Sequence, residues 1–305
     1  MKRPVRILLK VLFAVVMVVV AVAAFAMTDV RVPATSGFVV PMQEVRALAT
    51  STGEPLPTEL RSLKVGFGGV PRIFVVGGSG FEDQRMTFYS YQLVYEGGRT
   101  VIIDAVHDEP LHQEYFRGTF LRDGYAKMQQ AMSKADAIAI THEHFDHCAG
   151  IAKSPDFERL APRVVLNEEQ VRNPLIKVGG FDEGRLGKLQ PLRYERLHLL
   201  RPGVVLIKAP GHTPGTQLIY VRLASGREFL LVGDIAWNMD NIRLPRAHPR
   251  VVNWLNSEDG KAMAAQLRAL HDLAKVEPDL NLVVAHDEAQ MDDYLRRGFI
   301  QDGFR

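Results

Sequence analysis

Short apolar runs that end at a polar residue recur along this chain. They lie at residues 101–103, 137–140, 204–207, 229–232 and 282–285. Runs of this length that are rich in Val, Ile and Leu and bounded by Gly, Pro or polar residues are typical of buried β-strands. The pattern therefore predicts a core of several strands, each of which delivers a polar side chain where it ends.

Helical periodicity fills the intervals between these runs. Residues 255–276 carry one apolar stripe at helical spacing, formed by Met263, Leu267, Leu270 and Ala274. Residues 106–135 have similar spacing, and residues 43–50 predict a short helix. Strands and helices alternate to the end of the chain, so we expect one α/β domain over residues 64–305. Residues 28–63 are rich in Gly and Pro, and we interpret them as a linker.

The first 27 residues have a different pattern. Four basic residues among the first ten precede an uncharged apolar run from Val11 to Met27. Counted from Ile7, this stretch is long enough to cross a bilayer as one transmembrane helix, and its basic end predicts a cytoplasmic N-terminus. We therefore expect an inner-membrane anchor at residues 7–27, with the rest of the chain in the periplasm of a Gram-negative cell.

A second interpretation of this segment is a cleaved signal peptide. Ala24-Phe25-Ala26 has the A-x-A pattern of a cleavage site, and cleavage there would release the chain into the periplasm. The long apolar core favours the anchor, because signal peptides have shorter apolar regions.

Composition narrows the class of protein. The chain has 305 residues, of which 47% are hydrophobic, and a formal net charge of +2. This is the composition of a globular protein, and the near-neutral charge gives no electrostatic reason to expect a nucleic acid as partner. Cys148 is the only cysteine, which excludes an internal disulfide. No feature of the sequence selects an oligomeric state.

The segment after the apolar run 137–140 carries four side chains of types that bind metals. His142, His144 and His147 offer imidazole nitrogens, and Asp146 offers a carboxylate, all within six residues. Imidazole together with carboxylate suits zinc, and also iron, manganese, cobalt or nickel. Since a strand end is a rigid platform, we expect these side chains to form part of a metal site.

Later strand ends supply the additional ligands that a metal site needs from distant segments. They are His212 in the turn after residues 204–207, Asp234 after residues 229–232 and His286 after residues 282–285. Asp104 ends the run 101–103 in the same way. Two interpretations of Asp104 stand side by side: hydrogen-bonding support for the ligand loop, or a simple turn residue.

The order HxHxDH, GHTPG, GD and AHD across residues 67–294 resembles the metallo-β-lactamase superfamily. The resemblance implies an αββα sandwich with two divalent metal ions at one edge of its two sheets. Zinc is the first expectation for these ions, with iron, manganese, cobalt and nickel as alternatives. The implied ligands are His142, His144 and His212 for the first ion, Asp146, His147 and His286 for the second, and Asp234 for both.

The chemistry that this resemblance implies is hydrolysis. Two metal ions about 3.5–4 Å apart lower the pKa of a shared water and polarise the oxygen of the bond to be cleaved. Asp234 would bridge the two ions together with the resulting hydroxide, which is the nucleophile. Asp146 would orient its ion and relay a proton to the leaving group.

The resemblance, taken at the bridging position together with the segment around Asp146, implies a lactone as the substrate. Asp234 separates the chain from true metallo-β-lactamases, which lack a bridging aspartate, and groups it with lactonases, thioesterases and phosphodiesterases of the superfamily. The segment His144-Phe145-Asp146-His147 resembles the HFDH of N-acyl-homoserine-lactone lactonases. A small molecule similar to an acyl-homoserine lactone is therefore the expected substrate.

The chain departs from those lactonases at Trp237. They usually have a tyrosine three residues after the bridging aspartate, whereas an indole donates one hydrogen bond and cannot lose a proton as a phenol does. We expect Trp237 to contact the substrate as a wall for an apolar acyl group.

Thioesterase and phosphodiesterase activities are alternatives, the latter with Arg243 and Arg246 as phosphate-binding groups. An iron-dependent oxidoreductase of the same fold is the alternative from another class.

Overall fold

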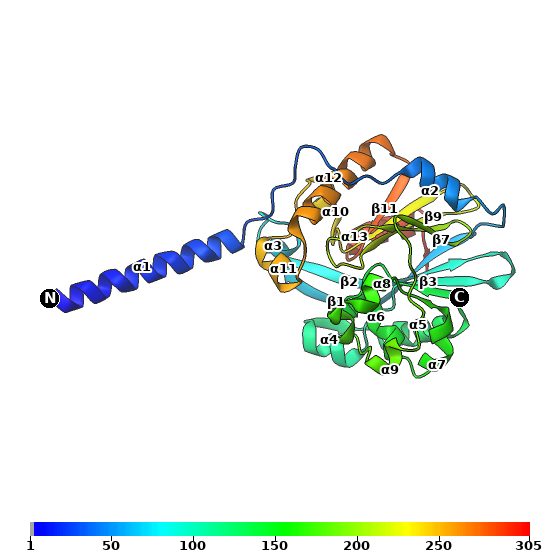
Figure 1. Ribbon diagram of the computed structural model, residues 1–305, viewed down its shortest axis with the longest axis horizontal. Helices are drawn as coiled ribbons and strands as arrows, with labels where there is room; N and C mark the ends of the chain where they lie inside the picture. The colour runs from blue at the N-terminus through cyan, green and yellow to red at the C-terminus, as the bar shows by residue number, and fades with distance from the viewer. Residues whose placement is uncertain (1–2) are drawn as a thin grey trace.

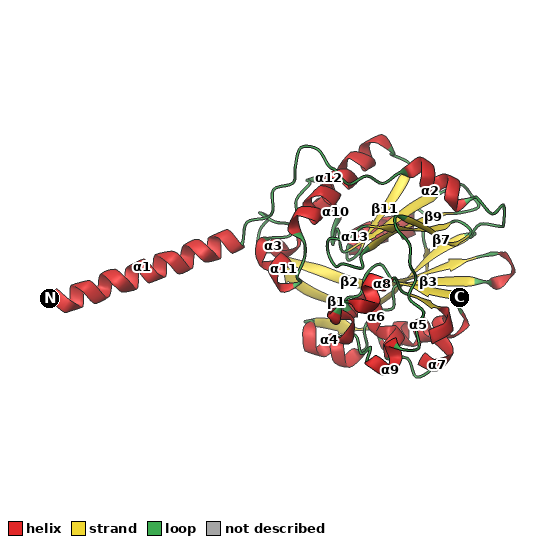
Figure 2. Ribbon diagram, viewed as in Figure 1, coloured by secondary structure: helices red, strands yellow, loops and turns green. Residues whose placement is uncertain are grey.

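A computed structural model describes the backbone of residues 3–305 and the side chains of residues 10–305 (Figure 1). Two β-sheets pack face to face, and helices cover the outer face of each sheet (Figure 2). The predicted mixed α/β class is confirmed, and the layers are those of an αββα sandwich.

The first sheet comes mostly from the first half of the chain. Its strand order is β12-β1-β2-β3-β5-β6, and β4 pairs with β1. Strand β2 is antiparallel to both β1 and β3, and β4 is antiparallel to β1. Strand β12 runs parallel to β1, and β5 runs parallel to both β3 and β6. The strands are β1 (Glu59–Pro71), β2 (Asp83–Val94), β3 (Thr100–Ile103), β4 (Gly118–Phe120), β5 (Ala137–Ala139), β6 (Val164–Val165) and β12 (Gln301–Asp302).

The second sheet comes from the second half of the chain. Its strand order is β11-β10-β9-β8-β7, in which only the pair β10 and β11 is parallel. The strands are β7 (Leu197–Arg201), β8 (Val204–Lys208), β9 (Gln217–Arg222), β10 (Glu228–Gly233) and β11 (Leu280–Val284). The five apolar runs predicted as strands thus lie in β3, β5, β8, β10 and β11.

Hydrophobic cores lie between the two sheets and on the outer face of each sheet. One lies between the sheets, where Tyr91 and Leu93 of β2 face Ile219 and Phe229 of the second sheet. On the outer face of the first sheet pack α4 (Glu109–Tyr115), α5 (Arg122–Lys134), α6 (Phe145–Ala152), α7 (Phe157–Leu160), α8 (Glu168–Arg172) and α9 (Glu183–Leu186). On the outer face of the second pack α2 (Met42–Ala49), α10 (Met239–Arg243) and α12 (Gly260–Val276). The remaining short helices are α3 (Arg72–Val75), α11 (Arg250–Leu255) and α13 (Glu288–Arg296).

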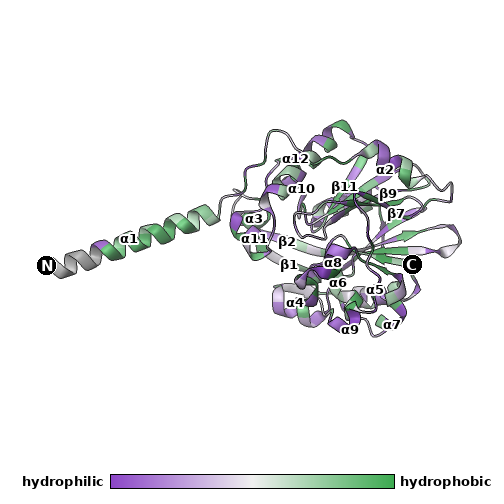
Figure 3. Cartoon of the chain, viewed as in Figure 1, coloured by the Kyte–Doolittle hydropathy of each residue, from purple (hydrophilic) through white to green (hydrophobic). Residues whose placement is uncertain are grey.

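Helix α1 (Arg3–Ala26) projects away from this sandwich (Figure 1), and the part of it that is coloured in Figure 3 is mostly hydrophobic. We expected a transmembrane helix at residues 7–27. The structure does not support it, because among the described residues no helix combines the length and the apolar character that crossing a membrane requires. Residues 1–2, at the start of the 27-residue N-terminal segment, lie outside the described residues. The signal-peptide interpretation stays a prediction.

The predicted linker, residues 28–63, contributes to the folded body. The short helix expected at residues 43–50 is confirmed as α2, and its Val45 is fully buried on the second sheet. From the same helix, Arg46 Nη2 donates to Glu228 Oε2 at 2.7 Å and to Glu277 Oε2 at 2.8 Å. Strand β1 already begins at Glu59. This segment is therefore tied to the second sheet by an apolar face and by ion pairs.

The helix predicted at residues 255–276 is interrupted. Helix α11 ends at Leu255, and α12 begins only at Gly260. Between them, Ser257 has a φ of +59°, a left-handed conformation that ends a helix. Asp259 then caps α12, because its Oδ1 accepts from the backbone N–H groups of the first turn. The resulting loop turns toward the predicted metal site.

Candidate metal centre

The strand ends that were predicted to carry ligands meet at one edge of the sandwich. The loop after β5 in the first sheet carries His142 and His144. In the second sheet, Asp234 and His286 follow the ends of β10 and β11, and His212 lies in the loop after β8. Because the two sheets each supply ligands, the site forms only when the sandwich closes.

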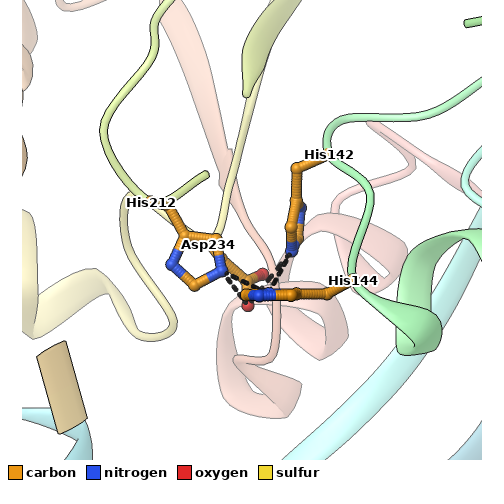
Figure 4. A group of neighbouring side chains, drawn as sticks. All are labelled: His142, His144, His212 and Asp234. Atoms are coloured by element: carbon orange, nitrogen blue, oxygen red, sulfur yellow. Dashed lines mark hydrogen bonds and ion pairs between the residues drawn. The ribbon is translucent and has the colours of Figure 1, made fainter. Parts of the chain in front are cut away.

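The first cluster consists of His142, His144, His212 and Asp234, whose side chains point toward one another (Figure 4). One donor atom of each residue lies within 4.8 Å of those of the other three. His144 Nδ1 is 3.2 Å from His142 Nε2 and 2.8 Å from His212 Nε2. Asp234 Oδ2 completes the group at 3.5 Å from His212 Nε2 and 3.8 Å from His142 Nε2.

The second cluster consists of Asp146, His147, His286 and again Asp234. Here the other oxygen of Asp234 is used: Oδ1 lies 3.1 Å from His147 Nε2 and 3.3 Å from His286 Nε2. Asp146 Oδ2 lies 3.6 Å and 3.8 Å from the same two nitrogens. Asp234 therefore faces one cluster with each oxygen, which is the arrangement of a bridging carboxylate.

The clusters fit two divalent cations. His147 Nε2 and Asp234 Oδ1 are buried, and within the described residues neither makes a hydrogen bond although they are 3.1 Å apart. Buried polar atoms without partners are costly, and a cation between them would satisfy both. The donor set of imidazole and carboxylate matches zinc and related transition metals. The ligand roles of the seven side chains stay predictions that this geometry supports.

Charge and burial keep part of the site ready to bind a cation. Burial and the neighbouring His212 lower the pKa of His144 to about 3. Burial and His147 hold the pKa of His142 well below its ordinary value. A neutral imidazole is the form that binds a metal. For His147, burial opposes protonation, but nearby carboxylates, Asp234 first, outweigh it and raise the pKa.

Three of the histidines are held through Nδ1, so that Nε2 faces Asp234. The acceptors are Asp104 Oδ2 at 2.9 Å from His147, the Thr87 carbonyl oxygen at 3.1 Å from His286, and Glu258 Oε1 at 2.9 Å from His212. Because a carbonyl or carboxylate oxygen only accepts, Nδ1 carries the proton, and in the neutral ring Nε2 keeps a free lone pair. Thr87 and Glu258 were missed in the sequence, since neither lies near a motif.

Asp104 supports the ligand loop, as one of its two sequence interpretations proposed. Its Oδ1 accepts from the backbone N–H of Thr141 at 2.6 Å, directly before His142. Thr141 also explains the glycine before Asp234: a side chain at Gly233, whose φ is +54°, would lie 2.9 Å from Thr141 Cβ. Only glycine lets β10 approach this loop so closely.

Glu143 is a third residue that the sequence analysis missed, although it lies inside the HxHxDH motif. Its side chain is fully buried. It accepts hydrogen bonds from Thr213 Oγ1 at 2.7 Å, from Asn173 Nδ2 at 2.6 Å and from the Gly215 N–H at 3.1 Å. Glu143 thus ties the loop that carries His142 and His144 to the loop that carries His212.

A cavity of about 220 Å³ opens beside both clusters. Its wall is mainly apolar and aromatic. It is lined by Val70, Met86, Phe88, Tyr115, Phe116, His144, Phe145, Asp146, Asp234, Trp237, Asn256 and His286. Among the described residues, no lysine or arginine lines this cavity. The predicted phosphate-binding residues Arg243 and Arg246 are therefore not part of its wall.

Trp237 lines the cavity, and its indole also contacts the candidate bridging residue. Nε1 donates to Asp234 Oδ2 at 2.8 Å. The indole ring packs against His248, with ring centroids 4.1 Å apart. Trp237 therefore combines the predicted apolar wall with a hydrogen bond that orients Asp234.

His107, His112 and Cys148 lie near the site but belong to neither cluster. His107 Nε2 is 3.0 Å from His112 Nδ1, and both rings are buried among aromatic side chains behind the cavity. Cys148 is fully buried, and its thiol contacts the Glu143 carbonyl oxygen at 3.5 Å. Cys148 thus occupies a small buried position.

Comparison with protein families gives one match. The family model described as the metallo-beta-lactamase superfamily matches residues 87–286, which is most of the sandwich. No curated protein matches the chain in sequence.

Comparison with solved structures gives many matches of the same fold. An N-acyl homoserine lactone hydrolase with N-hexanoyl-L-homoserine at its catalytic metal centre has 15% identity and a TM-score of 0.60, covering 78% of this chain and 96% of its own. A probable metal-dependent hydrolase from Staphylococcus aureus has 16% identity and a TM-score of 0.57, with coverages of 77% and 91%. A dizinc quorum-quenching lactonase has 15% identity and a TM-score of 0.53, with coverages of 76% and 89%. At these identities the likeness shows the fold.

Proposed function

The chain belongs to the metallo-β-lactamase superfamily, and we propose that it is a dinuclear metal hydrolase that opens a lactone ring bearing an apolar acyl group. The observation that carries this proposal is the position of Asp234. Its two oxygens face two separate clusters of imidazoles beside an apolar cavity. That it is a metal-dependent hydrolase follows from the family and from this site; the lactone and the two-metal mechanism are the proposal.

His142, His144 and His212 would hold one ion, and Asp146, His147 and His286 the other, with Asp234 shared. When bound, two divalent ions supply a water of lowered pKa and polarise the carbonyl oxygen of the ester.

The protein's own groups prepare this site. Asp234 is fixed from one side by the indole N–H of Trp237, so its carboxylate cannot rotate away from the clusters. Asp146 lies at the cavity wall, where its carboxylate can take up the proton that the attacking water gives up and pass it to the alkoxide that leaves when the ring opens. The aromatic wall, which includes Phe88 and Phe145, excludes water from the bond to be cleaved.

The cavity favours a neutral ester with an apolar acyl group over a phosphodiester. A phosphodiester carries a negative charge, and the wall formed by the described residues offers no cationic side chain to bind it. The apolar wall suits an acyl chain, because apolar surface removed from water stabilises binding. The structurally similar proteins include enzymes that act on N-acyl homoserine lactones.

The test is elemental analysis of the full-length protein together with a substrate panel. The panel contains N-hexanoyl- and N-decanoyl-homoserine lactone, a hydroxyacyl thioester and a chromogenic phosphodiester. We expect two zinc ions per chain and turnover of the lactones in preference to the other two. Two metal ions per chain with turnover of only the thioester or only the phosphodiester would support the two-metal mechanism and reject the lactone as the substrate. One iron per chain without hydrolysis would support the oxidoreductase alternative instead.

A substitution at Trp237 separates its role in the cavity wall from its hydrogen bond to Asp234. Trp237→Phe keeps an aromatic wall but removes the hydrogen bond to Asp234 Oδ2. A hydrogen bond to a charged group contributes about 1.5–3 kcal/mol, so we expect kcat to fall roughly tenfold or more, with little change in the KM for the lactone. Steady-state kinetics on the zinc-loaded variant measure both. An unchanged kcat with a raised KM would show that Trp237 acts only as a wall.

A further inference from the structure

Glu258 lies directly behind the first cluster, on the loop between α11 and α12. Its side chain is 0% exposed. It accepts from His212 Nδ1 at 2.9 Å, His248 Nδ1 at 3.4 Å, Asn253 Nδ2 at 2.6 Å and Asn256 Nδ2 at 3.2 Å. A carboxylate with four donors around it is held in one orientation. Three of these donors, from His212, His248 and Asn256, belong to residues that form or contact the site or its wall.

The backbone of this loop is also attached to the turn that carries His212. The Asp259 N–H donates to the Gly211 carbonyl oxygen at 2.8 Å, and the Glu258 N–H donates to the Asn253 carbonyl oxygen at 2.8 Å. Ser257 takes the left-handed conformation just before Glu258, which turns the carboxylate inward. The loop is therefore shaped so that a single carboxylate reaches His212.

A second path leads from Glu258 to Asp234. The ring of His248, which donates to Glu258, packs on the indole of Trp237, and Trp237 Nε1 donates to Asp234 Oδ2. The same Oδ2 atom lies 3.5 Å from His212 Nε2. Glu258 thus contacts His212 directly. It is linked to Asp234 through the rings of His248 and Trp237.

We propose that Glu258 is a positioning residue for the first cluster. Its carboxylate holds His212 with the proton on Nδ1 and the lone pair of Nε2 toward the cation position, and through His248 and Trp237 it fixes the cluster-facing oxygen of Asp234. The inference rests on the proposed metal-dependent function but not on the identity of the substrate. The proposed role of Glu258 affects the affinity for the metal ion directly, and kcat as a consequence.

Competition for zinc between the full-length protein and a chromogenic chelator tests this role. Supporting partners of metal ligands typically contribute about 10–100-fold in affinity. We expect Glu258→Gln, which keeps one acceptor oxygen, to weaken the affinity for one zinc ion about tenfold, and Glu258→Ala to weaken it about a hundredfold. Glu277→Gln is the matched control, because Glu277 pairs with Arg46 on the outer surface of the second sheet, away from the clusters.

Kinetics on the zinc-saturated variants provide a second readout. A misplaced His212 and Asp234 should lower kcat while leaving KM nearly unchanged. If Glu258→Ala fails to fold, the zinc affinity of the near-isosteric Glu258→Gln variant still tests the proposal. Zinc affinities equal to that of the wild-type protein in Glu258→Gln and in any folded Glu258→Ala would overturn the proposal. Weakened zinc binding in a protein that hydrolyses no lactone would keep this role for Glu258 and reject the proposed substrate.

Discussion

Asp234→Asn should lose at least one metal ion per chain and lower kcat/KM for the best substrate on the order of a thousandfold or more. Asp234 is the one residue that belongs to both clusters, and each of its oxygens faces a different pair of imidazoles. An amide has one oxygen that accepts and one nitrogen that donates, so it can serve one cluster only. The variant also loses the negative charge that offsets two divalent cations.

Elemental analysis and steady-state kinetics on the same preparation check this expectation. His144→Ala should also lower the metal content and the activity, through loss of the ion at the first cluster. His144 Nδ1 lies close to both of the other imidazoles in that cluster. Asp272→Asn is the control: Asp272 pairs with Arg268 on the surface of α12 and touches neither cluster. A variant at Asp234 that retained full activity with a single ion would rule out the two-metal mechanism.

Glu143→Ala should destabilise the metal-free protein by about 3 kcal/mol of unfolding free energy. The fully buried carboxylate accepts from Thr213, Asn173 and the Gly215 N–H, and alanine leaves all three donors without this acceptor. Unsatisfied buried polar groups cost about 1–3 kcal/mol each, and neighbouring water offsets part of that sum. The loss falls on the contact between two ligand loops, so zinc affinity should drop as well.

Denaturant unfolding of the metal-free protein measures this change without a contribution from bound metal. Glu143→Gln should be affected less, because its amide oxygen still accepts one or two of the three hydrogen bonds. Glu183→Ala serves as the surface control, since its partner Lys177 is exposed and such pairs contribute about 0–1 kcal/mol. If Glu143→Ala unfolds at the same denaturant concentration as the wild-type protein, the two loops are held by other contacts.

The sequence alone determined the α/β class and the segments that form the site. Strands such as β5 and β10 could be read from their apolar runs, because burial of both faces of a strand leaves a local signature. The candidate ligands could be read for a similar reason: each lies in the segment that comes after a strand, so its position relative to the strand end is also local. The order of four motifs then indicated the family, which the match to residues 87–286 confirmed.

Local patterns were less informative where a side chain has a partner far along the chain. The apolar stripe of residues 255–276 predicted one helix, but Ser257 and Asp259 interrupt it to form the loop that carries Glu258. Residues 28–63 look like a linker in composition, yet Val45 is buried against the second sheet. The apolar character of the first 27 residues predicted a transmembrane helix, which the described part of the structure does not support.

Only the tertiary structure decided how the ligands are arranged and held. Glu258 reaches His212 across 46 residues, and Glu143 reaches Thr213 across 70. No spacing rule links such positions, because they meet only when two sheets and their loops pack together. The same packing gives each oxygen of Asp234 its own cluster. Residue types along the chain therefore specify the available chemistry, and the closure of the sandwich specifies which atoms face each other.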